Sequence, residues 1–145
     1  MATTRLPIDF KEFLQLLHAH NVEYILVGGY AVGYHGYPRA TVDLDVWIAR
    51  TAQNAAKLVI VLKEFGFDVH GLSEDLFLEE NKIIRMGTPP IRIDIITSAS
   101  GVDFADCYKD RIVDVLDDVE VNFISLRHLK MNKKASGRHK DLDDL

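Results

Sequence analysis

The sequence contains little cysteine and no long apolar run. Cys107 is the only cysteine, so the chain cannot form an internal disulfide. No run of about 18 apolar residues predicts a transmembrane helix, and the first residues lack the apolar core of a signal peptide. We therefore expect a cytoplasmic protein that does not bind membranes. With 145 residues, 48% hydrophobic and 27% charged, the chain is predicted to form one domain over 1–145.

Several common motifs are also missing. No Gly-Lys-Ser/Thr follows the pair Gly28-Gly29, which argues against a Walker-type ATPase. The pair is not part of a Gly-x-Gly-x-x-Gly sequence, which argues against a dinucleotide fold. The six histidines show no metalloprotease-like spacing, so a zinc site is not expected.

Positive charge is scarce except near the end of the chain. The net charge of −5 argues against a protein that simply coats nucleic acid. Residues 127–140 nevertheless contain six Lys or Arg residues and no acid. This segment could face phosphate groups or could be a solvated helix face, and charge alone favours the solvated face.

Apolar spacing and turn residues predict interleaved helices and strands. Asp9 and Glu12 predict a capping box at the first helix. Strands with short connections between them favour a mixed sheet over an all-parallel one, so the expected fold class is α/β (α+β) with helices flanking a mixed central sheet. Helices are predicted at 9–21, 30–37, 51–65, 103–109 and from 125 onward, strands at 23–27, 42–48, 82–86, 91–97, 111–116 and 119–124, and a short helix or loop at 73–80.

The sequence Asp43-Leu-Asp45-Val-Trp-Ile48 carries two acids on one strand. Side chains alternate along a strand, so Asp43 and Asp45 share one face, while Leu44, Val46 and Ile48 share the core face. Two such carboxylates repel each other unless a cation lies between them. Carboxylate oxygens are the ligands that Mg²⁺ prefers. Trp47 follows on the same face, where stacking on a base and ordinary packing are equally plausible.

Asp94 lies within a second β-branched strand, Ile91-Arg-Ile-Asp-Ile-Ile96. Acids are disfavoured in such a strand. If the two strands are neighbours, Asp94 joins Asp43 and Asp45, and three carboxylates on one face can bind two metal ions for phosphoryl displacement. The alternatives are a solvated sheet face and a simple ion pair between Asp94 and Arg92.

Gly28 and Gly29 follow an apolar strand and precede a short helix. A junction of this kind can present backbone N–H groups to an anion, and glycine permits the close approach of a triphosphate. A simple tight turn would carry the same pair of residues.

Taken together, the Gly-Gly junction, the Asp-x-Asp strand and the later strand with Asp94 resemble the nucleotidyltransferase fold of the DNA polymerase β superfamily. The Arg39-x-Thr41-x-Asp43-x-Asp45 sequence and the tail from Asn132 to Leu145 resemble AbiEii-type toxins and related small bacterial nucleotidyltransferases. The match covers residues 24–145.

This resemblance implies two Mg²⁺ (or Mn²⁺) ions, an NTP donor and transfer of NMP to an acceptor hydroxyl on RNA or protein. It implies that Asp43, Asp45 and Asp94 bind metal, with Asp94 also a candidate base. It further implies that Gly28 and Gly29 contact phosphate, that Arg39 contacts phosphate or the acceptor, and that Thr41 orients its loop. Lys133 and Arg138 are implied to neutralise charge during transfer. A toxin–antitoxin or phage-defence role, with a cognate partner, follows from the same resemblance.

Two other functions remain open from the sequence. A relative that binds nucleotide or RNA without turnover would not need all three acids. A two-metal phosphohydrolase would not need a cradle for a triphosphate.

Overall fold

The computed structural model describes residues 6–36, 43–88 and 91–137. Six strands form one mixed sheet in the order β3-β4-β2-β1-β6-β5. The pairs β1–β2, β3–β4 and β5–β6 are antiparallel, whereas β2–β4 and β1–β6 are parallel. The strands are β1 Tyr24–Val27, β2 Asp43–Ile48, β3 Ile83–Thr88, β4 Ile91–Ile96, β5 Ile112–Leu116 and β6 Val119–Phe123. This mixed sheet with flanking helices confirms the predicted fold class.

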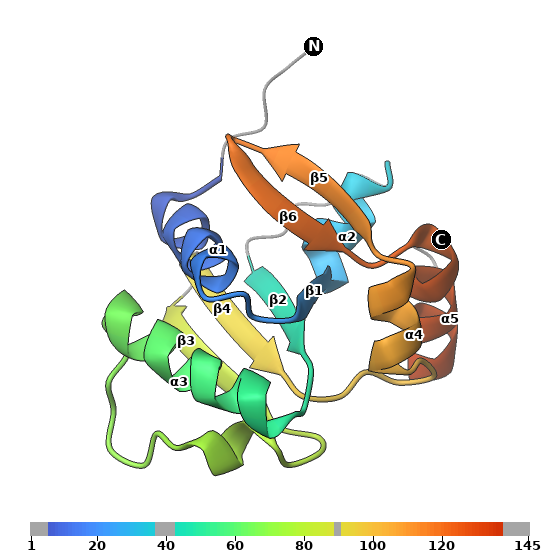
Figure 1. Ribbon diagram of the computed structural model, residues 1–145. Coiled ribbons are helices and arrows are strands. Elements are labelled where there is room, and N and C mark those ends of the chain that lie inside the picture. Colours follow the sequence, from blue (N-terminus) through green and yellow to red (C-terminus); the bar gives the residue numbers. More distant parts are fainter. Residues whose placement is uncertain (1–5, 37–42, 89–90, 138–145) are drawn as a thin grey trace.

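Helices cover both faces of the sheet (Figure 1). The helices are α1 Ile8–Ala19, α2 Gly28–Tyr34, α3 Ala52–Phe65, α4 Phe104–Lys109 and α5 Leu126–Ser136, with a short 3₁₀ helix, η1, at Glu74–Phe77. Helices α1 and α3 lie together on one face, and α4 and α5 lie beside the other end of the sheet. In the described part of the chain, no helix is both long and apolar enough to cross a membrane.

The main core lies between the sheet and helices α1 and α3. Leu44, Val46 and Ile48 of β2 are fully buried there, as their alternation predicts. Ile93 and Ile95 of β4 point into the same core. A smaller second cluster on the opposite face includes Val27, Trp47, Cys107, Ile124 and Leu129. The acidic residues of β2 and β4 alternate with the main-core residues, so they belong to this second face.

Capping residues and left-handed residues mark the ends of several elements. Thr51 accepts a hydrogen bond from the backbone of Asn54, and Ser125 accepts one from His128. Gly66 ends α3 in the left-handed region. Asp117 and Asp118 both have positive φ, which suits the tight turn between the antiparallel strands β5 and β6.

Two local predictions were wrong. Helix α1 begins at Ile8 after Pro7 and has no side-chain capping bond, so Asp9 and Glu12 form no capping box. Pro7 suits this boundary because proline needs no hydrogen-bond donor there. Helix α2 begins at Gly28 rather than Tyr30, so the Gly-Gly pair forms the first turn of the helix instead of a loop before it.

Candidate active site

Strands β2 and β4 bring the three predicted acids onto one sheet face. The two strands are parallel neighbours, with Asp45 directly opposite Asp94 and Asp43 opposite Arg92. Asp94 is only 5% exposed, and Asp43 and Asp45 are half-buried. The neighbour relation on which the three-acid hypothesis depended is therefore present.

Gly28 holds the start of α2 against the carboxylate of Asp45. Val27, the last residue of β1, pairs with Asp45 across the sheet. Gly28 has a φ of +65°, and a Cβ on this residue would collide with the Asp45 carboxylate. Glycine is therefore required both for the backbone conformation and for the close approach. Gly29 follows in the first turn of the same helix.

The crowding of carboxylates has a clear electrostatic consequence. Burial, together with the nearby charges of Asp94 and Asp43, raises the pKa of Asp45 to about 6. The positive charges of Lys133 and Arg92 act in the opposite direction. Asp45 is thus a carboxylate whose negative charge is unfavourable unless more positive charge is brought to it.

Arg92 supplies part of this positive charge. Its Nη2 atom lies 2.6 Å from an Asp43 oxygen, and its Nε lies 3.4 Å from Oδ1 of Asp94. The ion pair of Arg92 with Asp94, which the sequence offered as the alternative to a metal site, is therefore present, and the same guanidinium also bridges to Asp43.

Asp94 keeps one oxygen without a hydrogen bond. Within the described residues, its buried Oδ1 has no hydrogen-bond partner. Burial raises the pKa of Asp94, whereas Arg92 and Arg85 lower it. A buried carboxylate oxygen without a hydrogen bond costs free energy, and it is a suitable ligand for a cation.

Arg85 is a site residue that the sequence did not indicate. It lies opposite Asp94 on β3, and its Nε is 3.7 Å from Oδ2 of Asp94. Alternation along β3 could have placed Arg85 on the acidic face, but only the β3–β4 register shows which residue it faces.

Lys133 is the tail residue that reaches the acids. It is 6% exposed on the inner face of α5, and its charge lowers the pKa of Asp45. Lys130 and Lys134, on the same helix, are exposed. The basic segment is therefore divided: one lysine points toward the carboxylates, and its neighbours lie in solvent. Arg39, Thr41 and Arg138 lie outside the described residues.

A cavity of about 410 Å³ is lined by residues next to the acids, although none of the three acids lines it. Val27 and Lys133 line it, and both are neighbours of Asp45. Ile96, two residues beyond Asp94 on the same strand face, lines it as well. The rest of its wall comes from residues at the start of β3, from the segment after β4 and from α5, namely Asn81, Lys82, Ile83, Ser98, Ala99, Ser100, Asn132 and Ser136. None of these wall residues except Lys133 was expected at the site from sequence.

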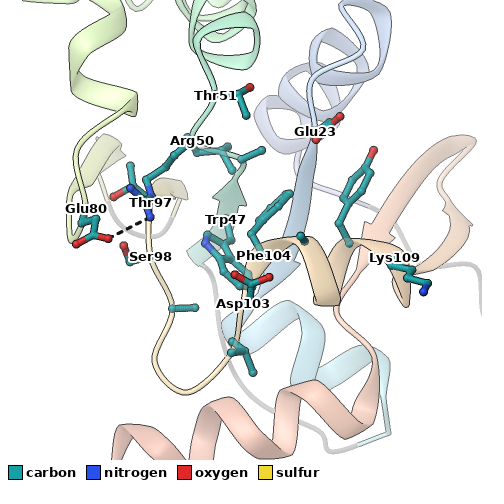
Figure 2. A pocket seen from close by; sticks show the side chains of 16 residues that line it. Glu23, Trp47, Arg50, Thr51, Glu80, Thr97, Ser98, Asp103, Phe104 and Lys109 are labelled. Atoms are coloured by element: carbon teal, nitrogen blue, oxygen red, sulfur yellow. Dashed lines mark hydrogen bonds and ion pairs between the residues drawn. The ribbon is translucent and has the colours of Figure 1, made fainter.

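A second cavity, of about 650 Å³, lies at the far end of β2 (Figure 2). Trp47 and Phe104 meet edge to face in its wall, and the ion pair between Arg50 and Glu80 lies at one side. None of the three acids lines this cavity. Trp47 is only 2% exposed, so it has the packing role rather than a surface for stacking a base.

The acids do not form a closed metal site as they stand. Across residues 6–36, 43–88 and 91–137, no group of three or more His, Cys, Asp or Glu is arranged to hold a metal ion. Arg92 donates a hydrogen bond to the Asp43 carboxylate. The chemistry of the donors still suits a hard cation: Asp45 is destabilised by its acidic neighbours, and Asp94 has an unbonded oxygen.

Comparison with known proteins gives one clear result. No curated protein matches the chain. Residues 5–145 match a family described as nucleotidyltransferases of unknown function, DUF6036. The match covers nearly the whole sequence and includes the acidic strands, the Gly-Gly junction and α5. The chain therefore belongs to the DUF6036 family of nucleotidyltransferases.

Proposed function

We propose that this protein transfers NMP from an NTP to an acceptor hydroxyl in a metal-dependent reaction. One observation carries the proposal: Asp45 and Asp94 face each other on adjacent strands, with the backbone of Gly28 held against the Asp45 carboxylate. Acidic side chains beside a close backbone approach suit a metal-bound triphosphate. A protein that only bound nucleotide would have no use for this repulsive cluster.

Asp45 and Asp94 would hold Mg²⁺ or Mn²⁺, and Asp43 would join them by exchanging its bond to Arg92 for one to the metal. When bound, the metal would neutralise charge on the phosphates and orient them for in-line displacement. The raised pKa of Asp45 and the unbonded Oδ1 of Asp94 support this assignment.

Lys133, Gly28 and Gly29 would bind the triphosphate. Lys133 carries its charge to the acidic face from α5, and the two glycines present backbone N–H groups from the start of α2. Arg39 and Arg138 are proposed as further phosphate contacts, and Thr41 as a residue that orients their loop.

The proposed reaction forms a bond between the acceptor oxygen and the α-phosphorus and breaks the bond from the α-phosphorus to the bridging oxygen of pyrophosphate. Pyrophosphate leaves with the electron pair of that bond. Asp94 would accept the proton of the attacking hydroxyl, since burial raises the pKa of this carboxyl toward the value that a general base needs.

The family resemblance alone supports the finer parts of the proposal, namely an RNA or protein acceptor and a role in a toxin–antitoxin or phage-defence module with a cognate partner. The rival function is a non-catalytic relative that binds nucleotide or RNA.

Incubation with each α-labelled NTP, Mg²⁺, total RNA and lysate protein tests the proposal. We expect label in one macromolecular fraction, and loss of that label with EDTA and in Asp45→Asn. Tight NTP binding without any transfer would favour the non-catalytic function. A matched control is Asp68→Asn, in an exposed loop, which should transfer label as the unchanged protein does.

A further inference from the structure

The cavity beside Lys133 has the character of a nucleoside site. Ile83 and Ile96 give it apolar wall on the side of β3 and β4, and Val27 adds to it from β1. Its volume of about 410 Å³ lies within the range for small-molecule sites. A phosphate chain bound at Lys133 would lead a base into this cavity, because Lys133 both lines the cavity and acts on Asp45.

Asn132 is an amide in the cavity wall with a fixed orientation. Its Nδ2 donates a hydrogen bond of 2.9 Å to the carbonyl oxygen of Ser100. Rotation of the amide by 180° would place Oδ1 against that carbonyl, where two acceptors repel each other. The contact uses one N–H, so within the part of the chain that the structure describes Oδ1 and the second N–H remain for a ligand.

We propose that Asn132 reads the base of the bound NTP and selects an exocyclic amine at purine position 6 or pyrimidine position 4. This inference rests on the proposed function. With the N–H that points away from Oδ1 donated to Ser100, the amide presents Oδ1 and its other N–H side by side, which is the pattern that pairs with adenine. Guanine and uracil carry a carbonyl oxygen at the corresponding position, and this oxygen would face Oδ1. The site therefore prefers ATP and CTP to GTP and UTP.

The sharpest test compares two ligands that differ at this position alone. ATP has an amine at position 6, and inosine triphosphate has a carbonyl oxygen there. Dissociation constants are measured by calorimetry for α,β-methylene analogues of both, with Mg²⁺, so that transfer does not interfere. We expect the adenosine compound to bind about tenfold or more tightly, because an unpaired polar contact at a built site is strongly rejected.

Variants of Asn132 assign the preference to this residue. Asn132→Leu should bring the two dissociation constants to within about twofold of each other, and Asn132→Gln, which keeps an amide, should restore part of the difference. Arg50→Gln, in the wall of the second cavity, should keep the full preference. Thermal unfolding of each variant checks that it is folded.

The outcomes separate the two proposals. If both analogues bind the unchanged protein equally, or if the preference survives in folded Asn132→Leu, the inference on Asn132 is overturned and the proposed function stands. If neither these two analogues nor the corresponding analogues of CTP, GTP and UTP bind at millimolar concentration, the proposed function fails, and the inference fails with it. The comparison of ATP with inosine triphosphate in the unchanged protein needs no variant, so equal binding overturns the inference even if the Asn132 variants do not fold.

Discussion

Replacing Asp45 with asparagine should stabilise the protein while removing its activity. The pKa of Asp45 is raised from 3.8 to about 6 in the folded state. Each unit of pKa shift corresponds to about 1.4 kcal/mol, so ionised Asp45 lowers the free energy of unfolding by about 3 kcal/mol. An asparagine has a similar shape and no charge, and it removes this cost.

The upward direction of the Asp45 pKa shift determines how the stability of the protein depends on pH. Because the folded-state pKa exceeds the unfolded value, the native protein binds more protons than the unfolded chain between about pH 4 and pH 6. The Asp45 contribution to stability is fully present below about pH 4 and is lost as the pH rises through about 6. Asp45→Asn should therefore equal the unchanged protein near pH 4 and exceed it by about 3 kcal/mol at pH 8.

Urea unfolding in EDTA measures this difference. Trp47 is the only tryptophan and is buried beside the site, so its fluorescence reports unfolding. Asp68→Asn, in an exposed loop, is the control and should change stability by less than about 0.5 kcal/mol at either pH. The difference in the free energy of unfolding between Asp45→Asn and the unchanged protein should be larger at pH 8 than at pH 4. A difference that is the same at both pH values would refute the electrostatic account of the acidic face.

Three further predictions concern the residues around the acids. Gly28→Ala should lower the transfer rate about 100-fold by displacing Asp45. Gly33→Ala, with open space at its Cβ, should keep the transfer rate and raise the free energy of unfolding by up to about 1 kcal/mol. Equal transfer rates in the two variants would contradict this. Lys133→Ala should raise the activation free energy of transfer by about 2–4 kcal/mol, whereas Lys134→Ala should change it little. Equal, small and strongly salt-dependent losses of activity in both variants would instead indicate that the segment docks RNA. Mg²⁺ or Mn²⁺ should raise the melting temperature in proportion to RT ln(1 + [L]/Kd), and an unchanged rise in Asp45→Asn would place the metal elsewhere.

The sequence predicted the acidic strands well because their signal is local. Alternation alone puts Asp43 and Asp45 on one face of β2 and Asp94 on the corresponding face of β4. That the two strands are neighbours, with Asp45 opposite Asp94, is a long-range fact that only the family resemblance suggested. The sequence places Lys133 and Lys134 on different faces of a helix, about 100° apart. Only the packing of α5 shows that Lys133 is the buried one.

Other parts of the site depend on tertiary contacts that no local pattern encodes. Arg85 faces Asp94 only because of the β3–β4 register. Asn132 enters the site only because the segment after β4 passes beside α5. Arg92 was considered as a partner of Asp94, but its stronger contact is with Asp43, across the neighbouring strand.

The most direct test of the central claim is to find which phosphorus atom reaches the acceptor. The protein is incubated with Mg²⁺, the acceptor fraction and ATP labelled at either the α- or the γ-phosphate. The account predicts that the α-label enters the acceptor, that the γ-label is released as pyrophosphate, and that Asp45→Asn and Asp94→Asn stop both events. Appearance of the γ-label in the acceptor, or as free phosphate without any α-transfer, would contradict it and would indicate a kinase or a phosphohydrolase.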